Sequence, residues 1–259
     1  MAYPSQINAV EGEQFNNYDG RRWPLGTRMV MQDGRRFVFA AAGGTALTAG
    51  NLQQSELPDA DHDTLAVQAA GSVGDRTISL TNGTDAIEAD LYADGFATLE
   101  AVAGASEGRL LKVDLTHDLL GASATVSLPL AAGYGLPLAI NTSDTVTLVK
   151  NPYEDVIEQP GPPTACVVGV ASSAIPIDNW GWLQTWGPCA ALVAGTEVLG
   201  GRISPTGTVT GTAGAIEASG VIITATNPTI AQITELIQIG ICMEVAPTGD
   251  YGIVFLTLS

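Results

Sequence analysis

The sequence predicts a mainly β fold, built of antiparallel sandwich or barrel domains and preceded by an extended N-terminal arm. Apolar residues make up 46% of the 259 residues and charged residues only 14%, which suits a buried core and excludes a disordered chain. Short runs rich in Val, Ile, Leu and Thr recur at intervals of about 8–15 residues. Between them stand turn-forming Gly, Asn and Asp, and the chain contains 30 glycines.

A hairpin is expected over residues 29–39. Met29-Val30-Met31 leads into Gln32-Asp33-Gly34-Arg35, and Arg36-Phe37-Val38-Phe39 leads out. Asp-Gly between two apolar runs is a strong hairpin signal.

Further strands are expected in two series. Those of the first series are 77–81, 96–100, 110–114, 124–128 and 145–149. Those of the second series are 166–170, 179–186, 207–211, 220–225, 239–245 and 251–258. Short helices could lie within residues 41–71, at 51–54 and 64–70, and the segment after Asn227-Pro228-Thr229 fits a helix or a strand.

Three parts of the chain are predicted. Residues 1–28 are polar and interrupted by proline, which indicates an extended arm that adds little to the stability of the body. Residues 29–159 form a first β-rich domain. The run 151–163 holds four of the fourteen prolines, so a boundary near 160 separates this domain from a C-terminal sandwich or barrel over 160–259.

The charge balance limits the partners. The net charge is −17, which disfavours binding to nucleic acid and to anionic membranes. Neither a membrane span nor a signal peptide is expected. Five arginines and four acids give residues 1–36 a charge of +1, so residues 37–259 carry −18. The basic and aromatic residues at this end are candidates for binding an acidic partner: Arg21, Arg22, Trp23, Arg35 and Arg36.

No motif predicts an enzyme, a metal site or a cofactor. Gly104-Ala-Ser106-Glu-Gly108 has the spacing of a hydrolase nucleophile, with Asp114 and His117 after it, but short strands flank it and a glycine-rich loop is the expectation. Asp59-Ala-Asp61-His-Asp63 starts like a calcium loop but lacks its later Gly and Glu, so a solvated loop is expected. We expect Cys166, Cys189 and Cys242 to be buried free thiols.

Three indoles form the most distinctive pattern. Trp180, Trp182 and Trp186, with Gln184 between them, share one face of a strand at a period of two. This aromatic strip fits the core of a small barrel, and it equally fits an interface or a sugar-binding face.

From about residue 75 onward the chain resembles tailed-phage structural proteins associated with capsid decoration. The resemblance lies in Asp85-Ala-Ile-Glu-Ala-Asp-Leu-Tyr-Ala-Asp-Gly-Phe, Gly104-Ala-Ser-Glu-Gly, Val146-Thr-Leu-Val-Lys-Asn-Pro-Tyr153, Trp180-Gly-Trp-Leu-Gln-Thr-Trp-Gly-Pro188 and Val254-Phe-Leu-Thr-Leu-Ser259. It implies a non-enzymatic virion protein on the outer surface of the head, which binds the major capsid protein. It also implies a homo-oligomer, with a trimer favoured. The alternatives are a tail or fibre component whose β domain binds glycans through the indoles, and an esterase built on Ser106.

Overall fold

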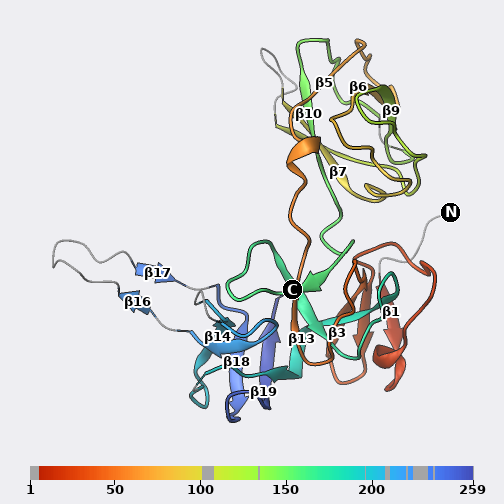
Figure 1. The fold of residues 1–259 in the computed structure, drawn as a ribbon. Helices are drawn as coiled ribbons and strands as arrows, with labels where there is room; N and C mark the ends of the chain where they lie inside the picture. Colours follow the sequence, from red (N-terminus) through yellow and green to blue (C-terminus); the bar gives the residue numbers. More distant parts are fainter. Residues whose placement is uncertain are drawn as a thin grey trace. The chain divides into compact units, whose positions relative to one another are not determined.

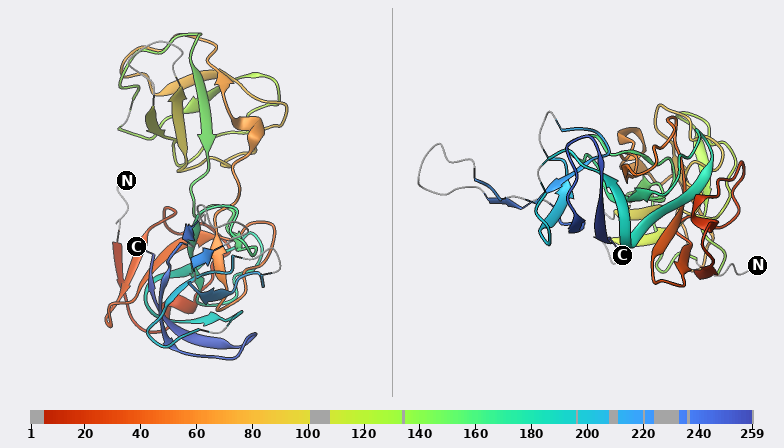
Figure 2. Two further views of the ribbon diagram at one scale, coloured as in Figure 1. Left: turned by 90° about the vertical axis from the view of Figure 1, so that its left-hand side faces the viewer. Right: turned by 90° about the horizontal axis from the view of Figure 1, so that it is seen from below.

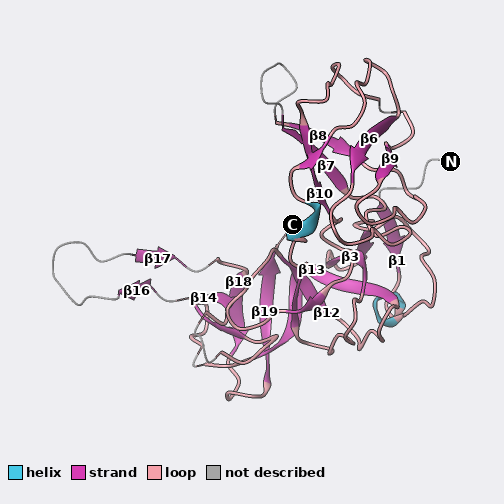
Figure 3. Ribbon diagram, turned by 45° about the horizontal axis from the view of Figure 1, so that its top comes forward, coloured by secondary structure: helices cyan, strands magenta, loops and turns pink. Residues whose placement is uncertain are grey.

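The protein is mainly β with almost no helix. The computed structural model describes residues 6–100, 108–133, 135–195, 197–207, 211–219, 221–223, 233–235 and 237–258. Within these residues the helical elements are two short 3-10 turns, η1 (Glu13–Phe15) and η2 (Ala60–His62), shown in cyan in Figure 3. The mainly β expectation is confirmed, and the sheets of the described residues are not closed into a barrel.

The chain divides into two compact units. Unit 1 consists of residues 1–56 and 152–259, and unit 2 of residues 57–151. The expected division near residue 160 differs from this arrangement, in which unit 2 interrupts unit 1. The reason is a set of long-range strand pairs, because β4 (Leu52–Gln54) pairs with both β11 (Ile157–Glu158) and β12 (Val167–Ala171). Local composition carries no signal for such pairs.

Unit 1 is built on one large sheet, to which eleven strands of the described residues belong (Figure 1). Its main path has the order β1-β2-β3-β13-β19-β18-β14-β15, and β4, β11 and β12 join beside β13. The bounds on the main path are β1 Gln6–Ala9, β2 Arg28–Met31, β3 Arg36–Ala41, β13 Trp180–Leu192, β19 Tyr251–Thr257, β18 Gly240–Glu244, β14 Arg202–Pro205 and β15 Ile216–Ala218. A separate ladder joins β16 (Val221–Ile223) to β17 (Ile233–Glu235). The residues that we singled out at 208–210 and 227–229 lie outside the described part of the chain.

The long strand β13 is the centre of unit 1. Its first half pairs with β3 and β12, and its second half pairs with β19. In both views of Figure 2 the blue C-terminal strands lie beside it. Since β3 comes from the start of the chain and β19 from its end, β13 joins both ends into one sheet.

A β-bulge interrupts β13 at Thr185. Gln184 is opposite Phe37, and Trp186 is opposite Arg36, so Thr185 is the extra residue. The Gln184 side-chain amide donates to three backbone oxygens further along the strand, those of Trp186 (3.1 Å), Gly187 (3.3 Å) and Pro188 (2.7 Å). One extra residue exchanges the two faces of the strand beyond it.

The N-terminal segment is packed, contrary to the expected extended arm. Strand β1 pairs in parallel with β2, and Tyr18 forms a bridge to Trp180. The Trp23 ring lies 5.3 Å from Tyr18, 5.2 Å from Phe39 and 5.3 Å from Trp182, centroid to centroid. The pattern was missed because these aromatics are spaced irregularly among polar residues. They bury their rings against β3 and against β13, which lies more than 150 residues away.

Unit 2 contains a sheet with the order β5-β10-β7-β8 and a separate pair, β6-β9. The bounds are β5 Leu65–Ala66, β6 Thr77–Thr81, β7 Phe96–Glu100, β8 Arg109–Lys112, β9 Thr125–Pro129 and β10 Thr145–Val149. One apolar cluster fills the unit, and its fully buried members include Ile78, Leu80, Ile87, Ala97, Leu128 and Val146. The alternation of buried and exposed residues along β6 and β9 is the period of two that the sequence showed.

Most predicted strands are present. The hairpin over 29–39 is confirmed as β2 and β3, and the strands over 77–81, 96–100 and 145–149 have the expected bounds. The short helices expected at 51–54 and 64–70 are wrong. These segments form the strands β4 and β5, because Leu52 and Leu65 are buried in sheets and tertiary pairing overrides a weak helical pattern.

We predict that Trp23→Ala lowers the stability of unit 1 by about 2–3 kcal/mol, because it removes the half-buried ring that joins Tyr18, Phe39 and Trp182. All four tryptophans belong to unit 1, so urea unfolding followed by tryptophan fluorescence reports on that unit alone. Phe15→Ala, at a ring that is 55% exposed, is the control and should change stability by less than about 0.5 kcal/mol. Equal stability of the Trp23 variant and the parent would contradict the packing.

Candidate interaction surface

The strands β13, β18 and β19 carry an apolar surface on the side away from the core. We call it the outer face, and its residues are Trp186, Pro188, Ala190, Ile241, Met243, Tyr251, Ile253 and Phe255. The register supports this set, since Pro188 is opposite Phe255, Ala190 opposite Ile253, and Ile241 opposite Phe255. Met243 is the extra residue of a β-bulge in β18 and is included because its side chain is exposed. Paired residues project on the same face of a sheet. The residues between them, such as Cys189 and Val254, are buried in the core.

The outer face is exposed and mainly apolar. The exposed fractions are 40% for Ile241, 46% for Met243, 47% for Tyr251 and 40% for Ile253. In a chain of net charge −17, its charged neighbours are Arg36 beside Trp186, Arg202 opposite Ile241, and Glu244 opposite Ile253. A contiguous apolar patch of this kind is typical of a protein contact site.

A hollow adjoins the outer face. It has a volume of about 490 Å³, and its lining includes Phe15, Arg35, Pro188, Ala190 and Tyr251. Phe15 is 55% exposed, so the hollow extends the apolar surface from β13 towards η1. A surface that is both apolar and hollowed can accept a protruding side chain of a partner.

The structure distributes the five candidate partner-binding residues over several places. The Arg36 guanidinium lies 5.2 Å from the centroid of the Trp186 ring, which puts it at the end of the outer face. Arg22 lies 5.3 Å from the centroid of the Trp23 ring, within the packed N-terminal segment. Arg21 is half-buried and engaged in an interaction of its own.

Arg35 is already paired within the chain. Its guanidinium forms ion pairs with Glu11 and with Asp33, the latter at 2.6 Å. The Arg35 backbone N–H donates to Asp33 and, together with the guanidinium, lowers the pKa of that carboxyl. Of the two neighbouring arginines, Arg36 is therefore the one that offers a charge beside the outer face.

The three indoles do not form one strip. Trp182 is 1% exposed and belongs to a core cluster with Phe37 and Phe39, against which Trp180 packs. Trp186 follows the bulge and instead contacts Phe255, at 5.6 Å between ring centroids. Trp182 is therefore a core residue and is not accessible to a sugar, whereas Trp186 belongs to the outer face.

The histidines serve the interior of unit 2. Both approach Tyr92: His117 Nε2 accepts the Tyr92 backbone N–H at 2.9 Å, and His62 Nδ1 lies 2.7 Å from the Tyr92 hydroxyl. Because His117 Nε2 is engaged and buried, it is not positioned as a general base. Ser106 lies outside the described residues.

The acidic loop of unit 2 uses its carboxylates as internal acceptors. Asp61 accepts the backbone N–H of Asp85 at 2.6 Å and the Thr84 hydroxyl at 3.0 Å, while Asp63 accepts the Thr147 hydroxyl. The Asp85 N–H is the main cause that lowers the pKa of Asp61. Within the described ranges no group of three or more His, Cys, Asp or Glu residues is placed to hold a metal ion.

The cysteines differ in exposure. Cys189 and Cys242 are buried, as expected, whereas Cys166 is exposed, and the expectation for it is wrong. Burial raises the pKa of the Cys189 thiol to about 12. Burial and the nearby Glu197 raise the pKa of Cys242. Both thiols belong to a core cluster, and Cys189 also lines the hollow beside the outer face.

We predict a pH-dependent role for Asp61. Its folded pKa is lowered from 3.8, so the stabilisation is present above pH 4 and is lost as the pH falls through the folded pKa. Asp61→Asn should therefore lower the melting temperature of unit 2 at pH 7. The difference in melting temperature between the variant and the parent should shrink towards zero as the pH falls below the folded pKa of Asp61. Calorimetry of both proteins between pH 7 and pH 2.5 measures it. A difference that is the same at every pH would contradict this role, and Thr84→Val should give a smaller effect of the same sign.

The sequence patterns predicted β18 and β19 but ended the strand of β13 at Trp186, before Pro188 and Ala190, and they missed the outer face itself. The available signal was that apolar residues occupy both sides of each strand, as in Ile241-Cys242-Met243 and in Ile253-Val254-Phe255. A sheet with one solvated side alternates apolar and polar residues.

No helix in the part of the chain that the structure describes has the length and apolar character needed to cross a membrane. Comparison of the chain with protein-family models, with curated proteins and with solved structures found no match.

Proposed function

We propose that this chain is a non-enzymatic structural protein of a phage virion, which decorates or cements the outer surface of the capsid by binding the major capsid protein. The observation that carries the proposal is the outer face. An apolar, hollowed surface on an otherwise acidic chain supports burial against another protein subunit. The resemblance of residues 75–259 to capsid-decoration proteins supports the identity of that subunit.

The charge distribution supports the same proposal. A net charge of −17 opposes nonspecific aggregation, so the chain can expose an apolar face and remain dispersed before assembly. Arg36, stacked on Trp186, adds a cation at the edge of the face, where a carboxylate of the partner can pair with it. Contact through this surface is therefore expected to be mainly apolar, with a polar margin.

Immunogold electron microscopy of the virion, with antibody to this chain, tests the location. Label over the head is expected. Label confined to the tail, or virions without label, would contradict capsid decoration.

A binding assay tests the role of the outer face. Ile253→Asp should reduce binding to undecorated capsids more than tenfold, because it buries a second carboxylate beside Glu244 in a mainly apolar contact. Val73→Asp is the matched control, since Val73 is a 67% exposed residue of unit 2 and the charge change is the same. Cosedimentation with capsids measures both, and equal loss in the two variants would contradict attachment through the outer face.

The expected homo-oligomer, a trimer by the resemblance, belongs to the same proposal. Light scattering at micromolar concentration and at both low and high salt tests it. The mass of a single chain at both salt concentrations would contradict self-association, and a dimer would contradict the trimer alone.

A further inference from the structure

Strand β8 of unit 2 stands at the edge of its sheet. The order of that sheet is β5-β10-β7-β8, so β8 has a partner strand on one side only. On its other side the bridge from Val113 to Leu130 and the bond from the Ala131 N–H to the Lys112 oxygen close the end of the strand. On this second side of β8, the residues from Arg109 to Leu111 have no neighbouring strand among the described residues.

The backbone of Leu110 faces this open side. The Val113 N–H donates to Gly95 on the β7 side, at 3.0 Å. The backbone N–H and C=O groups of successive residues point to alternate sides of a strand. Those of Leu111 therefore also point towards β7, while those of Leu110 and Lys112 point away from it. The Lys112 oxygen confirms this direction, because it accepts the Ala131 N–H from the open side. The N–H and C=O of Leu110 are thus directed at the edge, and its side chain is 63% exposed.

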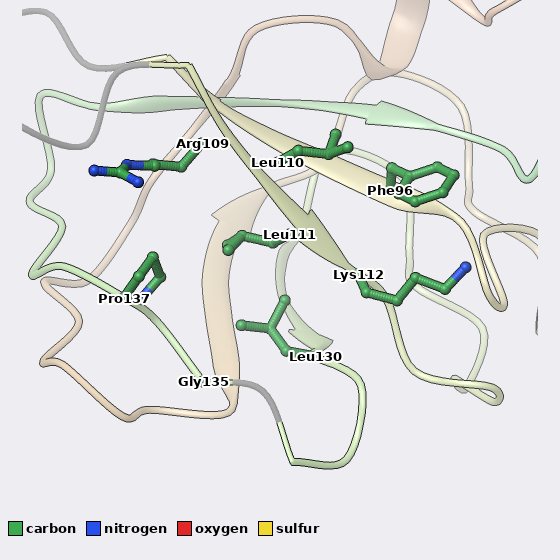
Figure 4. A pocket seen from close by; sticks show the side chains of 8 residues that line it. All are labelled: Phe96, Arg109, Leu110, Leu111, Lys112, Leu130, Gly135 and Pro137. Atoms are coloured by element: carbon green, nitrogen blue, oxygen red, sulfur yellow. The ribbon is translucent and has the colours of Figure 1, made fainter. Parts of the chain in front are cut away.

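A groove of about 530 Å³ runs along this edge. All four residues of β8 line it, and the lining is completed by Phe96, Leu130, Gly135 and Pro137. Figure 4 shows Leu111 and Leu130 directed towards one another, with Arg109 and Lys112 at opposite ends of the strand. The groove therefore offers both a row of backbone groups and apolar surface for side chains.

The charge of the groove is cationic although unit 2 as a whole is acidic. None of the described lining residues is Asp or Glu. Lys112 is neutralised by Asp94, with Nζ 2.7 Å from its carboxylate. Arg109 is exposed and forms no ion pair with any described residue. Arg109 is thus the charge that remains for a ligand.

We propose that this edge binds an extended, acidic peptide segment of another protein, which adds to β8 as a strand. Such a segment pairs its backbone with Leu110, directs an apolar side chain towards Leu111 and Leu130, and places a carboxylate against Arg109. A second copy of β8 is a poorer occupant, because it brings two more cations and no acid to this edge. The proposal goes beyond capsid decoration and does not depend on the outer face.

Peptide binding to the full chain tests the proposal. The probe is fluorescein-labelled Thr-Val-Val-Asp-Thr with blocked ends, and fluorescence anisotropy measures its affinity. Hydrogen exchange, read by NMR, should show that the Leu110 amide becomes protected at saturating peptide. The Leu111 amide, which already faces β7, should not change.

Variants and altered peptides separate strand addition from general attraction. Arg109→Gln should weaken binding about three- to fivefold, and Arg202→Gln, which removes an exposed arginine of unit 1, should leave it unchanged. Lys in place of Asp in the peptide should weaken binding, and N-methylation of the valine amide that faces Leu110 should abolish it. Exchange at Leu110 that is unaffected by the peptide, or equal affinity for the Lys peptide, would overturn the proposal.

Discussion

The structure of unit 1 depends on the pairing of β13 along its whole length. Its thirteen residues bind β3 and β12 in the first half and β19 in the second, so one strand connects the beginning of the chain to its end. A straight strand of this length would keep the same side chains on one face throughout. The bulge at Thr185 prevents that, and the Gln184 side-chain amide donates to the backbone oxygens of Trp186 and Pro188 just beyond it. The bulge therefore decides which residues of β13 face the core and which face the surface beyond Thr185.

The two sides of the bulge have different roles. Before it, Trp182 completes a core cluster with Phe37, Phe39 and the half-buried Trp23. After it, the alternate set of residues, from Trp186 to Ala190, joins the exposed side chains of β18 and β19. The same strand thus supplies an aromatic core at one end and an exposed apolar surface at the other. The acidity of the rest of the chain makes that exposed surface tolerable in solution.

Local patterns predicted many of the strands but not β1, β4, β5, β11, β14 or β15, and they did not predict the arrangement. Asp33-Gly34 between apolar runs was enough to predict the β2–β3 hairpin, because its pairing is local. The division into units and the packing of Trp23 depend on contacts between residues over 100 positions apart, which a single sequence does not encode in any local period. The period of two also predicted Trp186 on the same face as Trp182. That was wrong because Thr185 is a bulge residue, and its side chain does not distinguish it from an ordinary strand residue. Of the residues singled out in the sequence, Arg36 and Trp186 meet at the outer face. Arg35 is instead paired with Asp33, and the sequence alone did not distinguish it from Arg36.

We propose above all that the outer face is covered by another protein in the assembled particle. Hydroxyl-radical footprinting tests it directly, because Met243 and Tyr251 are readily oxidised and are 46% and 47% exposed in the single chain. If the outer face is covered in the virion, both side chains are oxidised in the free protein and protected in the virion. Cys166, which is exposed and distant in sequence from these strands, serves as the internal reference. Equal oxidation of Met243 and Tyr251 in the virion and in the free protein would contradict the account.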